Sequence, residues 1–258
     1  MNQPFVTIIT PSFNQAPWLE ATIQSVLAQT QPDFEYIIID GGSTDGSLEI
    51  IQKYADKLSF WQSKPDGGQT NAINIGYKKA KGKLIAYLNA DDLLEPTAVE
   101  TVIRTFEVNN EMAVYYGRCK TIDSDGNLVK EGEGAQVNFH GLTKDGMLPN
   151  IFQPACFFNK KYLDPVQFVN SDYKFAFDYD LILSLAAKKS FLFLNRDIAS
   201  YRVHKDSKSY LNKVDAYKEK LSIQEHYAKK DFLLWKWRRL KLAVAEKTGK
   251  IANGKAAL

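Results

Sequence analysis

Apolar and polar positions follow two alternating patterns along the first hundred residues, one typical of strands and one typical of helices. Short apolar runs rich in β-branched residues predict strands over residues 6–10, 36–40, 58–61 and 84–88. Between them, apolar residues recur at helical spacing, which predicts a helix starting near Pro17 and further helices over 47–55, 70–80 and 96–108. This order is typical of βαβ units, so we expect an α/β domain with a largely parallel central sheet flanked by helices.

The pattern changes after residue 110. Residues 114–116, 120–123 and 128–130 predict three short strands, the last two joined by a turn at Asp125 and Gly126. Residues 131–150 are rich in glycine and polar residues, which predicts a mobile connection. We therefore expect one domain over 1–210, with halves 1–110 and 111–210, followed by a basic helical tail over 211–258.

Composition narrows the class of protein. The chain has 258 residues, of which 45% are hydrophobic and 24% charged, as in an ordinary globular domain. No segment approaches the roughly 20 apolar residues of a membrane span, and the N-terminus lacks a basic segment followed by an apolar one. Cys119 and Cys156 form no CxxC pair. These features predict a cytoplasmic protein with reduced thiols.

Acidic residues follow the predicted strands. Asp40 ends the second strand, Asp66 follows the third, and Asp91 and Asp92 follow the fourth. In an open parallel sheet, ligands bind beyond the carboxyl ends of the strands, and adjacent carboxylates favour a hard divalent cation. The competing interpretation is that each carboxylate caps a helix or stabilises a turn. Three such positions at successive strand ends favour a ligand site.

Two other nucleotide-binding motifs are missing. No GxGxxG follows the first strand, and the segment 76–83 has the wrong spacing for a P-loop and is followed by Leu84 instead of serine or threonine. The turns after Asp40 and Asp66 are nevertheless rich in glycine, so their backbone amides can approach a ligand closely.

Five motifs together resemble glycosyltransferase family 2, enzymes with the GT-A fold, over roughly residues 4–210. They are TPSFN at 10–14, DGGSTDG at 40–46, PDGG at 65–68, NAINIG at 71–76 and LNADD at 88–92. The resemblance implies a nucleoside diphosphate sugar as donor, UDP first, and Mn²⁺ or Mg²⁺ as cofactor. It implies an inverting hexosyltransferase-like enzyme of bacterial surface polysaccharide or glycolipid synthesis, with a glycan or lipid-linked acceptor.

The resemblance also assigns residues. The implied donor-binding residues are Thr10, Pro11, Asn14, Asp40, Asp66, Gly67, Asn71 and Asp91. The implied metal ligand is Asp92, with Asp91 and His204 as further candidates. Asn71, Ile75 and Asn89 depart from the Asp, Lys and Asp that many relatives carry at those positions.

The second half supplies the expected catalytic base. Asp178 matches the acidic position at the start of a helix in the family, and Asp180 is the second candidate. A carboxylate there would accept the proton of the acceptor hydroxyl as the new bond forms. The competing interpretation for both residues is helix capping and favourable placement at a helix N-terminus, and it is the stronger one for Asp180. The aromatic segment 153–158 is expected to border the sugar or to belong to the core.

The tail remains open to two interpretations. Its sequence mixes tryptophans with cations at Trp235, Trp237, Arg238 and Arg239. Such a helix suits peripheral contact with an anionic inner membrane face, or it packs on the domain and leaves a solvated basic face. No reading motif for nucleic acid accompanies it, so we expect no nucleic-acid partner. The alternative functions are a non-catalytic nucleotide-sugar or glycan-binding protein and a metal-dependent nucleotidyl or phosphoryl transferase.

Overall fold

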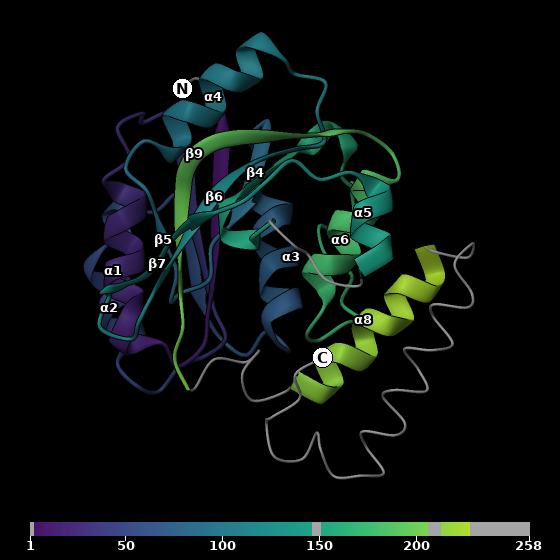
Figure 1. Cartoon of the computed structure of the whole chain (residues 1–258). Helices are drawn as coiled ribbons and strands as arrows, with labels where there is room; N and C mark the ends of the chain where they lie inside the picture. Colours follow the sequence, from purple (N-terminus) through teal and green to yellow (C-terminus); the bar gives the residue numbers. More distant parts are fainter. Residues whose placement is uncertain (1–2, 146–150, 206–212, 228–258) are drawn as a thin grey trace.

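The computed structural model describes residues 3–145, 151–205 and 213–227 (Figure 1). The first half contains β1 (Val6–Ser12), α1 (Ala16–Leu27), β2 (Phe34–Asp40), α2 (Ser47–Lys53), β3 (Phe60–Ser63), α3 (Gln69–Lys79), β4 (Leu84–Tyr87), β5 (Leu93–Leu94) and α4 (Ala98–Val108). The second half contains β6 (Val114–Ile122), β7 (Leu128–Glu133), α5 (Phe139–Asp145), β8 (Cys156–Asn159), α6 (Phe177–Ala186), β9 (Phe191–Arg202) and α8 (Lys213–Tyr227).

These strands form one mixed sheet in the order β3-β2-β1-β4-β8-β6-β9-β5, with β7 paired to β6. The strands β3, β2, β1 and β4 are parallel, as expected for the βαβ half. The sheet changes direction at β8, which is antiparallel to both β4 and β6. The carboxyl ends of β1, β2 and β4 therefore meet at one edge, where the second half closes over them.

Helices cover both faces of the sheet because alternate residues of each strand point in opposite directions. On one face, Ile9 and Ile37 pack with the buried side of α3 and with α6. On the other face, Ile8 and Ile38 pack with α1, α2 and α4. Figure 1 shows α1 and α2 on one side of the sheet and α3 and α6 on the other. The sheet is thus buried between two helical layers.

The second half differs from the sequence-based expectation in two places. The strands expected at 114–116 and 120–123 form the single strand β6, whose register with β9 shifts around Gly117 and Arg118. A side chain at Gly117 would collide with Ile198 of β9, so this glycine permits the close pairing. Residues 131–150 were expected to be a mobile connection, yet they include the end of β7 and all of α5.

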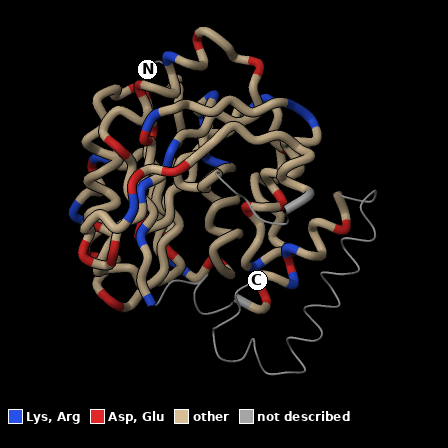
Figure 2. Tube along the Cα trace, viewed as in Figure 1, with Lys and Arg blue, Asp and Glu red and all other residues tan. Residues whose placement is uncertain are grey.

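The helix α8 packs against the second half of the domain. Leu221 and Ile223 are buried, and the Gln224 side-chain amide donates to the Thr143 carbonyl oxygen at 2.6 Å. Figure 2 shows acidic and basic residues close together along this helix. The start of the expected tail is therefore part of the folded domain. The residues expected at a membrane, Trp235 to Arg239, lie outside the described residues, and no described helix is long and apolar enough to cross a bilayer.

Candidate active site

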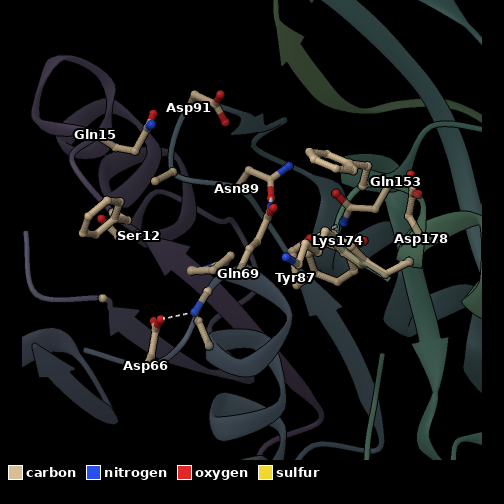
Figure 3. A pocket seen from close by; sticks show the side chains of 18 of the residues that line it. Ser12, Gln15, Asp66, Gln69, Tyr87, Asn89, Asp91, Gln153, Lys174 and Asp178 are labelled. Carbon is tan, nitrogen blue, oxygen red and sulfur yellow. Dashed lines mark hydrogen bonds between the residues drawn. The ribbon is translucent and has the colours of Figure 1, made fainter. Parts of the chain in front are cut away.

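A cavity of about 600 Å³ lies at the carboxyl ends of β1, β2 and β4. Ser12 at the end of β1, Gly41 after β2 and Tyr87 at the end of β4 line it, together with Lys174 and Asp178 from the start of α6. In Figure 3, Ser12 and Asp66 lie on one side of this cavity, and Lys174 and Asp178 lie on the other. Both halves of the chain therefore contribute to one site.

Four of the eight predicted donor-binding residues line this cavity: Pro11, Asp66, Gly67 and Asp91. The Asp66 carboxylate accepts a hydrogen bond from the Gly68 amide at 2.7 Å, drawn as a dashed line in Figure 3. Gly67 and Gly68 both have positive φ angles, of 80° and 115°, which favour glycine. The glycine turn thus holds the Asp66 carboxylate at the cavity wall.

The other four, Thr10, Asn14, Asp40 and Asn71, are absent from the cavity lining. Asp40 is fully buried, and one of its oxygens accepts hydrogen bonds from the Gly42 amide, the Ser43 amide and the Ser63 hydroxyl. Its role here is to fold the turn that presents Gly41. The Thr10 hydroxyl shares a hydrogen bond with the Tyr36 hydroxyl, and the Asn14 side chain accepts from the Thr44 amide. Their contribution to the site is structural in this conformation.

The adjacent carboxylates Asp91 and Asp92 point in different directions. Asp92 is fully buried, and its two oxygens accept hydrogen bonds from the Arg202 amide at 3.0 Å and from the Asn89 side chain at 3.2 Å. Burial, and then the neighbouring charge of Asp91, raise the pKa of Asp92 well above its usual value. Asp91 lines the cavity instead. The geometry therefore favours Asp91 over Asp92 as the metal ligand.

His204 lies beside Asp91. Its Nε2 atom is 3.0 Å from the Asp91 Oδ2 atom, and its side chain is only 3% exposed. The buried Nδ1 atom of His204 has no hydrogen-bond partner among the protein atoms. His204 and Asp91, both offered by the sequence as candidate metal ligands, thus lie side by side in the fold, although 113 positions separate them along the chain.

The pair Asp91 and His204 fits a divalent cation. A carboxylate oxygen and an imidazole nitrogen are both ligands of Mn²⁺, and such an ion fills its remaining positions with water and substrate phosphates. No group of three or more potential ligand side chains occurs in the part of the chain that the structure describes. The protein would therefore supply two ligands, and the donor diphosphate would complete the set.

Arg202 anchors the backbone at Asp91. Its buried guanidinium donates from Nε to the Asp91 carbonyl oxygen at 2.8 Å and from Nη1 to the carbonyl oxygens of Asp123 and Ser124. Its link to the turn after β6 could not be recognised from spacing along the chain.

Asp178, the first candidate for the general base, reaches the cavity from α6. It lies in the first turn of α6 and lines the cavity. Burial raises the pKa of Asp178, and the positive charge of Lys220 opposes that effect. Asp180, the second candidate, is not among the residues that line this cavity. It lines a smaller separate cavity and accepts a hydrogen bond from Tyr227, so the geometry favours Asp178.

Sequence reasoning missed two polar cavity residues, Gln69 and Tyr87. The Gln69 side chain donates to the Asn89 side chain at 2.9 Å. The Tyr87 hydroxyl is buried and has no hydrogen-bond partner among the described residues. In the expected segment 153–158, Gln153 lines the cavity and donates to the Tyr87 carbonyl oxygen at 2.6 Å, whereas Phe157 and Phe158 are fully buried and belong to the core.

Residues 7–177 match the sequence profile of glycosyl transferase family 2. The chain belongs to this family. Proteins that this family 2 chain resembles include chondroitin synthase of Pasteurella multocida, 31% identical over 81% of this chain and 22% of that protein. Hyaluronan synthase of Pasteurella multocida is 31% identical over 80% and 21%. Chondroitin synthase of Escherichia coli is 30% identical over 84% and 31%. The chain thus spans about a fifth to a third of the length of these relatives.

Solved structures confirm the expected GT-A fold of this family 2 chain. TarS 1–349 of S. aureus, in complex with UDP-GlcNAc, superposes with a TM-score of 0.68 at 18% identity, covering 85% of this chain and 65% of that one. The mannosyltransferase PcManGT from Pyrobaculum calidifontis, in complex with GDP-Man and Mn²⁺, superposes with a TM-score of 0.63 at 16% identity, covering 100% and 77%. At these identities the likeness establishes the fold alone.

Proposed function

We propose that this chain transfers a sugar from a nucleoside diphosphate donor to a hydroxyl of a glycan or lipid-linked acceptor, with inversion at the anomeric carbon. The observation that carries the proposal is the shared cavity in which Asp91 and His204 face Asp178 across the sheet edge. One end suits a cation and a diphosphate, and the other suits a hydroxyl that must lose a proton.

The reaction is a single displacement. The acceptor oxygen attacks the anomeric carbon, its proton passes to the Asp178 carboxylate, and the bond from the anomeric carbon to the diphosphate oxygen breaks with its electron pair. A divalent cation held by Asp91 and His204 would neutralise the charge that develops on the departing diphosphate. Because the acceptor enters opposite the leaving group, the configuration inverts.

The donor and product follow from the relatives. One solved structure of this fold carries UDP-GlcNAc and another carries GDP-Man with Mn²⁺. Three relatives are bacterial polysaccharide synthases by name. We therefore infer a UDP-sugar as the first donor to test and a bacterial surface polysaccharide or glycolipid as the product class.

The two alternative functions fit the geometry less well. A binding protein without catalysis has no need of a buried carboxylate beside the ligand cavity, and Asp178 is such a carboxylate. A phosphoryl transferase would need cations around the phosphates near the first strand. Among the described residues, Lys174 is the single lysine or arginine that lines the cavity, and it lies on the α6 side.

Calorimetric titration tests the proposal. UDP, GDP and dTDP are each added to the purified protein with Mn²⁺ and then with excess chelator. We expect one nucleotide to bind and its affinity to fall when the metal is removed. Sugar nucleotides with that base are then incubated with chondroitin and hyaluronan oligosaccharides as acceptors. A folded protein that binds none of the three nucleotides would contradict the proposal.

A further inference from the structure

The segment that leads into α6 is held by a carboxylate from a distant helix. The backbone amides of Lys174, Phe175 and Ala176 all donate to the side chain of Glu219 on α8, at 2.9, 2.8 and 2.9 Å. Ala176 is the N-cap residue of α6, and no side chain of its own segment caps that helix. Glu219 therefore binds the amide of the N-cap residue and the amides of the two residues that precede it.

This arrangement stabilises a helix start that would otherwise be incomplete. Amides at a helix N-terminus lack partners within the helix and are commonly satisfied by a neighbouring side-chain oxygen. Hydrogen bonds to an ionised carboxylate are roughly twice as strong as those between neutral groups. Three such bonds converge on Glu219. The last of the three donor amides lies two residues before Asp178, which is in the first turn of α6 and lines the cavity.

Glu219 is itself held firmly. Leu221 and Ile223, close to it on α8, are buried against the domain, and Gln224 donates to the Thr143 carbonyl oxygen. Because packing fixes the helix, it also fixes the carboxylate. Lys174 supplies one of the bonded amides and Asp178 follows the last of them by two residues, and both line the cavity. The position of α8 therefore affects the cavity wall.

We propose that α8 completes the catalytic centre, with Glu219 as a positioning residue that fixes the segment entering α6 and, through it, the place of Asp178 at the cavity wall. The proposal rests on the proposed function, in which Asp178 is the general base. It makes α8 a working part of the enzyme, although no described residue of that helix lines the cavity.

The test compares Glu219→Gln with Asp215→Asn as the matched control. Asp215 suits this purpose because it is exposed and lies one turn earlier on the same helix. Transfer is measured as UDP release from UDP-GlcNAc, or as GDP release from GDP-mannose if titration shows a GDP preference. Hydrogen exchange is followed in peptides that cover residues 174–178. We expect faster exchange and a roughly tenfold loss of kcat in Glu219→Gln, with donor affinity within about twofold of wild type.

The outcomes separate the two proposals. If the wild-type protein neither binds nor turns over any donor, the proposed function fails, and the role of α8 fails with it. If the wild type is active and Glu219→Gln matches Asp215→Asn in kcat, only the role of α8 is overturned. Equal losses of donor affinity and turnover would also overturn it, because a positioning residue of the base acts on kcat.

Discussion

The indole ring of Trp18 lies on the imidazole ring of His204, with ring centroids 3.9 Å apart and planes inclined by 36°. The Trp18 indole N–H donates to the Ser124 carbonyl oxygen at 3.1 Å, the same oxygen that accepts from Arg202. The imidazole is therefore held between an aromatic face and the Asp91 carboxylate. Trp18, on α1, therefore fixes the orientation of His204, the proposed metal ligand that follows β9.

Replacing Trp18 should weaken Mn²⁺ binding without removing a ligand. An aromatic pair contributes about 1 kcal/mol, so Trp18→Leu should lower Mn²⁺ affinity by roughly fivefold. Trp18→Phe keeps an aromatic face and should retain most of that affinity. Electron paramagnetic resonance of free Mn²⁺ in a titration with UDP present measures both. Equal affinities in wild type and Trp18→Leu would show that the stack has no orienting role.

Asp91 and Asp92 should differ in their effect on the metal. Asp91→Asn is expected to lower Mn²⁺ affinity by at least about tenfold, because the residue lines the cavity beside His204. Asp92→Asn should retain more of the affinity, since the Asp92 carboxylate is buried and accepts from the Arg202 amide instead of lining the cavity. The same Mn²⁺ titration compares the two variants. The opposite order of affinities would restore the family-based assignment of Asp92.

Asp178 should control turnover and its pH dependence. Asp178→Asn is expected to leave donor affinity intact and to lower transfer by on the order of a hundredfold or more. Asp180→Asn, outside the cavity lining, should stay near wild type. Burial raises the pKa of Asp178. Because the base must be ionised to accept a proton, activity should decline on acidification, and the decline should begin at a higher pH than it would for an ordinary aspartate, whose pKa is about 4.

The same shift has a consequence for stability. The folded protein binds the Asp178 proton more tightly than the unfolded chain does, so this group favours folding below its unfolded pKa. That contribution is lost as pH rises through the folded pKa. Asp178→Asn should therefore melt at a higher temperature than wild type near neutral pH. A lower melting temperature there would contradict the cost of the buried charge.

Tyr87→Phe should stabilise the protein. The Tyr87 ring packs against the rings of Phe158, Phe168 and Phe177, and its buried hydroxyl has no hydrogen-bond partner among the described residues. A buried unsatisfied hydroxyl costs about 1 kcal/mol or more, so its removal should raise the free energy of unfolding by about that amount. Urea unfolding measures the change. A loss of stability would mean that the hydroxyl has a favourable partner in solution.

The strand ends were predictable from the sequence, and the direction of their side chains was not. Apolar runs followed by acidic residues located Asp66 and Asp91 at the cavity because strand direction alone decides which edge they reach. Asp40 and Asp92 follow the same pattern and turn inward. Their orientation depends on partners elsewhere in the fold, Ser63 for the first and Arg202 for the second.

The supporting residues were missed because no local pattern marks them. In the sequence, Trp18 is one of several apolar residues in an amphipathic helix, and Glu219 is one of several charged residues on α8. Each acquires a role only through contact with a segment from another part of the chain, the β9 end for Trp18 and the start of α6 for Glu219. The expected mobile connection over 131–150 similarly concealed α5, whose short helix lies in a polar, glycine-containing stretch.

The 113 positions between Asp91 and His204 have a consequence for synthesis of the chain. A ribosome releases Asp91, with its βαβ half, well before β9 and His204 emerge. Until then the nascent chain lacks one side of the proposed cation site. Under the proposed function, a translation product interrupted before β9 would bind little sugar nucleotide and would not consume it.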